Sequence, residues 1–189
     1  MSRPLRIGVL ALQGNFREHI ATLAGLGVEA TEVRKPEHLE GLDGLIVPGG
    51  ESTAIARLIG LYSFEEPLRK FPGAMFGTCA GMILMGRDGL LGQVDIGVDR
   101  NSYGRQVASF EADFQLEDEE RPLRGVFIRA PRVTDVGEGV EILAELDGDP
   151  VLLRQGRFLV ASFHPELTDD TRVHERFLDL VREETHVGA

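Results

Sequence analysis

The chain has 189 residues, enough for one domain with a substantial hydrophobic core but too few for a second catalytic module. Hydrophobic residues make up 42% and charged residues 27% of the sequence, which is ordinary for a globular protein. The 31 acidic residues outnumber the 20 basic ones, and the net charge of −11 argues against binding to nucleic-acid backbones or to anionic membranes.

The chain contains one cysteine, Cys79, which excludes an intramolecular disulfide and a multi-cysteine zinc site. We therefore expect a reducing, cytoplasmic setting. The apolar run 7–12 near the N-terminus is too short for the hydrophobic segment of a signal peptide and ends at Gln13. It predicts a first buried strand instead.

In the first half of the chain, strands alternate with helices. A helix pattern begins at Phe16, and a second helix has Ser52 or Thr53 as its expected N-cap. The alternation predicts a parallel sheet with helices on both faces. Strands are expected at 7–12, 28–33, 45–47 and 74–76.

After about Gly92 the pattern changes to successive strands, with an acidic surface turn among them and an amphipathic helix at the end. The helix is expected over 173–181, and the acidic turn over 117–120. We predict one α/β domain over residues 1–189, a flavodoxin-like mixed sheet flanked by helices, with an antiparallel-rich second half. The expected strands are 94–98, 109–116, 125–129, 140–146, 151–155 and 158–163.

Cys79 lies at the centre of the segment Gly77-Thr78-Cys79-Ala80-Gly81, between a short apolar run and a helix-compatible stretch. A strand, a sharp turn between glycines and a helix form a nucleophile elbow, here with cysteine in place of serine. A helix N-terminus also favours the thiolate. The alternative is that Cys79 is a small buried hydrophobic residue, as most free cysteines are.

A possible base and its orienting carboxylate follow the last predicted strand, in the segment His164-Pro165-Glu166. Cysteine, histidine and glutamate at strand ends, in this order, predict a triad for acyl transfer. The remaining histidines have no partners at a suitable spacing, and we assign them no function: His19, His38, His174 and His186.

Four candidate segments lie directly after predicted strands. In open α/β sheets, sites form beyond the carboxyl ends of the strands, where Gln13, the Gly49-Gly50 turn, Cys79 and His164 all fall. We expect an oxyanion hole from the backbone N–H groups of Gly49, Gly50 and Ala80. Arg100 and Arg129, although most arginines are simply solvated, are candidates to hold a substrate carboxylate.

Six segments together resemble the glutaminase subunits of pyridoxal 5′-phosphate synthase (the PdxT family), which are class I glutamine amidotransferases. G-x-C-x-G with H-P-E is typical of the class as a whole, and the other segments narrow the resemblance to this family. The resemblance runs from the first strand to the last helix. The segments are GVLALQG (8–14), PGGEST (48–53), FGTCAG (76–81), RNSYGRQ (100–106), FIRAP (127–131) and SFHPELT (162–168).

The resemblance implies that Cys79 is the nucleophile and that His164 and Glu166 complete the triad. It also implies hydrolysis of L-glutamine, with the ammonia passed to a partner synthase. In the family, glutaminase subunits dock on a dodecameric synthase core and are nearly inactive until docked. Neither a metal nor a cofactor is expected on this chain, since pyridoxal phosphate is made on the partner. The residues implied in glutamine binding are Gly50, Glu51, Ser52, Arg100, Ile128 and Arg129.

Three alternatives remain open from the residues. A general cysteine hydrolase would use the same triad without needing the arginines. A non-catalytic binding module would not need an intact Cys79, His164 and Glu166. The third alternative is a glutaminase that supplies ammonia to a different synthase.

Overall fold

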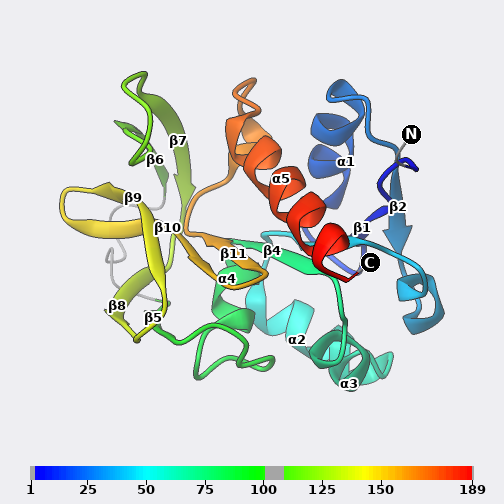
Figure 1. Ribbon diagram of the computed structural model, residues 1–189. Helices are drawn as coiled ribbons and strands as arrows, with labels where there is room; N and C mark the ends of the chain where they lie inside the picture. Colours follow the sequence, from blue (N-terminus) through cyan, green and yellow to red (C-terminus); the bar gives the residue numbers. More distant parts are fainter. Residues whose placement is uncertain (1–2, 101–108, 189) are drawn as a thin grey trace.

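The computed structural model describes residues 3–100 and 109–188, and its largest element is a seven-stranded sheet in the order β2-β1-β3-β4-β11-β10-β9 (Figure 1). The first five strands of this order run parallel, and β10 and β9 are antiparallel to their neighbours. The predicted mixed α/β fold is thereby confirmed. The strands are β1 (Ile7–Leu10), β2 (Ala30–Val33), β3 (Gly44–Val47), β4 (Ala74–Thr78), β9 (Glu141–Leu146), β10 (Asp149–Gln155) and β11 (Phe158–Ala161).

Helices cover both faces of this sheet. The helices α1 (Phe16–Gly25) and α5 (Arg172–Val187) lie on one face, and α2 (Ser52–Leu61), α3 (Glu65–Arg69) and α4 (Ala80–Met85) lie on the other (Figure 1). Two short 3₁₀ helices, η1 (Pro36–Leu39) and η2 (Pro165–Leu167), follow β2 and β11. In the described ranges no helix is both long enough and apolar enough to cross a membrane.

Alternate side chains of the central strands divide the hydrophobic core into two layers. Ile46 and Phe76 pack with Phe177 of α5, whereas Leu45 and Met75 pack against the opposite helices. All five side chains are fully buried. Because strand side chains point alternately to opposite faces, continuous apolar runs are what a sheet covered on both faces requires.

Two antiparallel ribbons pack beside the β10–β9 end of the sheet: β5 (Ile96–Asp99) with β8 (Arg132–Val136), where β8 contacts β10, and β6 (Ser109–Phe114) with β7 (Leu123–Ile128), where β6 contacts β9. The rings of Phe110 and Phe127 stack across the β6–β7 hairpin at 4.8 Å between centroids. Phe127 also contacts Phe163, which follows β11. The hairpin is therefore anchored to the segment that leads to His164.

The structure departs from the sequence prediction in several places. β8 and α3 were not predicted, and the closing helix extends to Val187 rather than ending at Val181. The expected N-cap of α2 at Ser52 or Thr53 is wrong, because Glu51 caps the helix by accepting hydrogen bonds from the N–H groups of Thr53 and Ala54. The other strands match the prediction to within about two residues at each end, the usual scatter of such boundaries.

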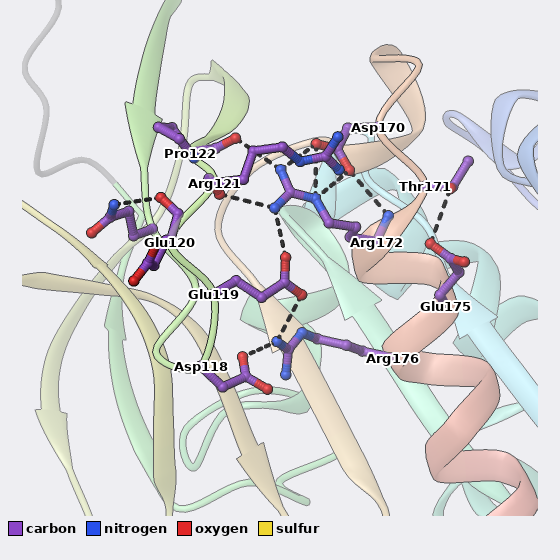
Figure 2. A network of polar contacts seen from close by, with 11 residues as sticks. Asp118, Glu119, Glu120, Arg121, Pro122, Asp170, Thr171, Arg172, Glu175 and Arg176 are labelled. Carbon is purple, nitrogen blue, oxygen red and sulfur yellow. Dashed lines mark hydrogen bonds and ion pairs between the residues drawn. The ribbon is translucent and has the colours of Figure 1, made fainter.

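An arginine at the start of α5 ties this helix to the β6–β7 turn (Figure 2). Arg172 donates to Glu119 Oε2 at 2.7 Å, to the carbonyl of Pro122 at 2.8 Å and to Asp170 Oδ2 at 2.6 Å. Its side chain is only 11% exposed. Thus the predicted acidic turn at 117–120 is not simply solvated: Glu119 pairs with Arg172, and Asp118 with Arg176 of the next turn of the helix.

We expect Arg172→Met to lower the free energy of unfolding by about 1–3 kcal/mol, because it leaves the partly buried Glu119 and Asp170 carboxylates without their donor. Arg182→Met is the matched control on the same helix. Its side chain is 50% exposed and, among the residues that the structure describes, forms an ion pair with Asp179 alone, so its loss should cost about 0.5 kcal/mol or less. Urea unfolding of both variants measures the difference, and equal effects would contradict the anchoring role of Arg172.

Candidate active site

The carboxyl ends of β1, β3, β4 and β11 meet at one edge of the sheet. The predicted segments follow these strands: Gln13 after β1, the Gly49-Gly50 turn after β3, Cys79 after β4 and His164 after β11. The register pairs β3 with β4 and β4 with β11, so the strands end side by side. The structure thus brings together four segments that are far apart in the sequence, as the strand pattern predicted.

Cys79 occupies a strained turn between β4 and α4. Its φ of 51° and ψ of −104° lie in a region that non-glycine residues rarely adopt. The turn is held in place by the Cys79 N–H, which donates to the carbonyl of Ala161 in β11 at 2.8 Å. The turn has the geometry expected of a nucleophile elbow: the side chain is aimed from the end of the sheet, and its sulfur lies 3.8 Å from the carbonyl oxygen of Ile128.

The two glycines that flank the elbow allow α4 to approach the sheet closely. A Cβ on Gly81 would overlap the carbonyl of Val47 in β3, and one on Gly77 would lie 2.6 Å from Met85 Sδ. A side chain at either position would push α4 off the sheet and move Cys79 with it. The G-x-C-x-G spacing therefore has a packing reason as well as a chemical one.

His164 and Glu166 form a close buried pair. Nδ1 of His164 lies 2.6 Å from Glu166 Oε1, and both side chains are almost fully buried. Asn15, at the start of α1, donates from Nδ2 to the same Oε1 at 3.2 Å. Because Nδ1–H is donated to the carboxylate, the imidazole is fixed in the tautomer whose Nε2 is free to accept a proton.

The surroundings favour the charged forms of this pair. Burial lowers the pKa of His164, but its interactions with the Cys79 thiol and the Glu166 carboxylate outweigh burial and raise the pKa to about 10. Burial likewise raises the pKa of Glu166, but the charge that His19 carries when it is protonated, and the hydrogen bond from His164, lower it to about 2. At neutral pH, His164 is thus an imidazolium beside a carboxylate.

The loops after β1 and β3 are hydrogen-bonded to each other beside the Cys79 turn. Gly14 has a φ of 97°, and a Cβ there would overlap the Gly49 carbonyl. The N–H of Asn15 donates to that carbonyl at 2.9 Å, and Gln13 Oε1 accepts from the N–H of Glu51 at 3.0 Å. The N–H of Gly49, predicted to serve the oxyanion hole, donates here to the Thr78 hydroxyl at 3.1 Å.

A cavity of about 600 Å³ opens over Cys79 and His164, large enough for a small amino-acid substrate. Arg100 reaches it from beyond β5, where its Nη2 donates to Ser52 Oγ at 2.6 Å. Three predicted site residues do not line the cavity: Gly49, Ala80 and Glu166. The residues that line the cavity are Asn15, Gly50, Glu51, Ser52, Cys79, Ile83, Arg100, Ser109, Ile128, Arg129 and His164.

Some predicted features look different in the structure. The Glu51 carboxylate faces the N-terminus of α2, and backbone hydrogen bonds from Thr53 and Ala54 lower its pKa. Arg129 has a φ of 44°, which bends the chain at the end of β7. The rest of the RNSYGRQ segment, from Asn101 onward, lies outside the described residues.

Two of the histidines that have no partner at a suitable spacing in the sequence are nevertheless buried together beside the site. His19 of α1 lies 3.5 Å from Glu166 Oε2 and 2.8 Å from His174 of α5. The signal was present, because each histidine interrupts the apolar stripe of its helix at a buried position. Asn15 was missed as well: it has the sequence position of an N-cap, but its side chain turns to Glu166 instead.

Within the part of the chain that the structure describes, no three His, Cys, Asp or Glu side chains are grouped so as to hold a metal ion.

Comparison with known proteins identifies the family. The SNO glutamine amidotransferase family matches residues 9–183. The "Pyridoxal 5′-phosphate synthase subunit PdxT" of Thermus thermophilus is 54% identical over 185 residues, covering 92% of this chain and 96% of that protein. The protein of the same name from Thermosipho africanus is 50% identical over 189 residues, covering 94% of this chain and all of that protein.

Solved structures are similar to this chain as well. A crystal structure described as a glutamine amidotransferase superposes with a TM-score of 0.87 at 53% identity, covering 93% of this chain and 98% of that one. A protein described as part of a putative GMP synthase, from Thermoplasma acidophilum, superposes with a TM-score of 0.76 over the whole of this chain and 99% of the other. Its identity of only 15% shows that the fold is shared and no more.

Glu166→Gln should destabilise the protein most at mildly acidic pH. The His164 pKa is raised from 6.5 to about 10, so its contribution is complete below 6.5 and disappears as the pH rises through 10. The Glu166 pKa is lowered from 4.5 to about 2, so its contribution is present above 4.5 and disappears as the pH falls through 2. Both contributions are therefore complete between pH 4.5 and 6.5.

Urea unfolding of the wild type and of Glu166→Gln at about pH 5.5 and about pH 9.5 measures this dependence. The loss of stability should be larger at the lower pH. Glu29→Gln, which changes an exposed carboxylate before β2, is the control and should show little difference between the two conditions. A larger loss at the higher pH would contradict the charge assignment of the pair.

Proposed function

The chain belongs to the SNO glutamine amidotransferase family, and we propose that, as the glutaminase subunit of a pyridoxal 5′-phosphate synthase, it hydrolyses L-glutamine to L-glutamate and ammonia with Cys79, His164 and Glu166. The observation that carries this proposal is the meeting of Cys79 and His164 on one cavity, with Glu166 Oε1 2.6 Å from the imidazole. We further propose that residues 1–189 act as a single glutaminase domain.

In the first half-reaction, the Cys79 thiolate attacks the side-chain amide carbon of glutamine. His164, which holds the thiol proton, returns it to the departing nitrogen, and ammonia leaves with formation of a glutamyl thioester. In the second half-reaction, a water molecule gives a proton to His164 and attacks the thioester. Glutamate leaves and the thiol is restored, while Glu166 stabilises the imidazolium at each stage.

The developing oxyanion is held by backbone N–H groups of Ala80 and of the Gly49-Gly50 turn. In the present arrangement the N–H of Gly49 donates to Thr78, and its carbonyl accepts from Asn15. One peptide of the turn must therefore rotate before Gly49 contributes. Loss of one oxyanion donor typically lowers the rate by about 10²–10³-fold, so docking on the partner that rotates this peptide would switch the enzyme on.

Glutamine binds in the cavity over Cys79. Its α-carboxylate and α-amino group are held by Arg100, by the backbone of Ile128 and Arg129, and by the turn from Gly50 through Glu51 to Ser52. The position of Arg100 supports this assignment, because Ser52 and Thr53 hold its guanidinium at the cavity wall. A guanidinium fixed in this way matches the geometry of a carboxylate.

The ammonia passes to a partner synthase, and we propose that glutaminase subunits dock on a dodecameric core of that partner. The complex works in the cytoplasm, where the single catalytic thiol stays reduced. This chain itself holds neither a metal nor a cofactor, since the chemistry of the triad needs none.

Cys79→Ala should abolish the release of glutamate, because no other thiol is present to form the thioester. The measurement is glutamate production from glutamine by the purified chain, with and without its cognate synthase. The wild type should be active chiefly with the synthase. The variant should still co-elute with the synthase, which controls for folding. Turnover by Cys79→Ala at the wild-type rate would rule out the mechanism.

Arg100→Ala should raise the KM for glutamine by about tenfold or more with a smaller change in kcat, because it removes ground-state binding rather than a reacting group. Arg124→Ala changes an arginine that is 57% exposed on β7 and should leave both constants unaltered. An Arg100→Ala enzyme with normal KM would favour a general cysteine hydrolase.

A further inference from the structure

Two histidines lie in the core behind the triad, on the face of the sheet away from the substrate cavity. His19 and His174 are both fully buried, and Nδ1 of His19 lies 2.8 Å from Nε2 of His174. Phe76 packs edge-on against both rings. None of the three proposed catalytic groups comes from α1 or α5, yet each of these helices contributes one of the histidines.

The second nitrogen of His19 faces two groups that belong to the site. Nε2 lies 3.1 Å from the Thr78 hydroxyl and 3.5 Å from Glu166 Oε2. That carboxylate oxygen is buried and has no hydrogen-bond partner among the described residues, so the N–H of His19 is the donor nearest to it that the contacts show. The Thr78 hydroxyl also accepts the N–H of Gly49. His19 therefore lies between the carboxylate of the triad and the peptide proposed for the oxyanion hole.

The contacts determine which nitrogens carry hydrogens. A lone pair on Nε2 of His19 would face the negative oxygen of Glu166, so we assign the hydrogen to Nε2. Nδ1 of His19 then accepts, and the donor must be Nε2–H of His174. Nδ1 of His174 then carries no hydrogen, in agreement with its lack of any hydrogen-bond partner among the described residues.

Both rings are neutral at the pH of the reaction. Burial lowers the pKa of His19 more than the neighbouring Glu166 raises it, and burial lowers the pKa of His174 to about 3. The titratable groups that face His19 are Glu166 and His164 from the segment after β11, His174 from α5 and Glu18 on its own helix. The strand β4 presents Thr78 and Phe76, which do not titrate.

We propose that His19 is a positioning residue for the reaction: oriented by His174 and by its contact with Thr78, its Nε2–H faces the Glu166 carboxylate and so keeps that carboxylate in place against His164. The proposal rests on the glutaminase function argued above. Two phenylalanines would fill this space without leaving a buried nitrogen unpaired, so packing alone gives no reason for histidines here.

Two substitutions distinguish the role of Nε2 of His19 from that of Nδ1. In His19→Gln the side-chain amide nitrogen reaches the place of Nε2, where it can donate to Thr78 and still presents an N–H to Glu166 Oε2. In His19→Asn the shorter amide keeps the contact with His174 but not the one with Glu166. A role in packing alone predicts that activity follows thermal stability in both variants, whereas a positioning role depends on which nitrogen is retained.

We expect His19→Asn to lower the kcat for glutamine of the complete complex with the synthase by about 10–100-fold, the usual effect of losing a group that orients a catalytic side chain. The KM should stay within about twofold, because the cavity lining is untouched. His19→Gln should retain kcat to within about fivefold. His186→Gln, at an exposed position near the end of α5, is the control and should behave as the wild type.

A second readout does not depend on glutamine. Since Cys79 is the only cysteine, the rate of alkylation by iodoacetamide across pH reports on the Cys79–His164 pair alone. His19→Asn should be alkylated several-fold more slowly at neutral pH than His19→Gln, because a less firmly held Glu166 stabilises the imidazolium less. His174→Phe, which removes the donor to His19, should resemble His19→Asn in this assay.

The two readouts separate failure of this proposal from failure of the function. If the wild-type complex releases no glutamate but the alkylation rates follow the expected order, the function is wrong and the positioning role stands. If the wild type is active and His19→Asn matches His19→Gln in both kcat and alkylation, the positioning role is overturned. Loss of activity in both variants in proportion to their loss of thermal stability would also overturn it.

Discussion

The carboxylate of Glu166 is the constraint on which the site depends. Its side chain is fully buried and ionised, and a buried charge is tolerated only with close polar partners. Those partners come from separate parts of the chain: His164 from the same loop, and Asn15 and His19 from the start of α1. The first helix and the last strand must therefore meet at this charge, although about 150 residues separate them along the chain.

The second constraint is the close approach of backbones around Cys79. The place of a Cβ on Gly49 is occupied by the His164 ring, 2.5 Å from Cε1, and Cys79 Cβ lies only 3.2 Å away. Gly14 and Gly81 have similar contacts with the carbonyls of Gly49 and Val47. The glycines thus set the spacing between histidine, thiol and turn, and the strained φ of Cys79 is maintained by this surrounding packing.

Sequence reasoning succeeded where structure is encoded locally. Apolar runs followed by glycine turns predicted β1, β3 and β4 and the edge at which Cys79 and His164 meet, because parallel strands necessarily end together. It failed where contacts between residues far apart in the sequence determine the structure. β8 has little apolar character of its own and exists because β5 pairs with it, and Glu51 caps α2 in place of the more typical Ser52. His19 and His174 are far apart along the chain, so no spacing rule links them.

Thr78 shows how one strand joins the two halves of the site. Side chains alternate along β4, so Thr78 points with Phe76 toward α1 and α5, which is why a histidine from α1 meets it. The next residue, Cys79, leaves the strand and turns toward the cavity. The surroundings of Cys79 are therefore organised from two directions: the cavity opens over the thiol, while the Glu166 carboxylate and the Thr78 hydroxyl are contacted by His19 from the core behind it. Because these contacts lie in the core, the positions of His164 and Glu166 relative to each other are fixed whatever occupies the cavity in front of them.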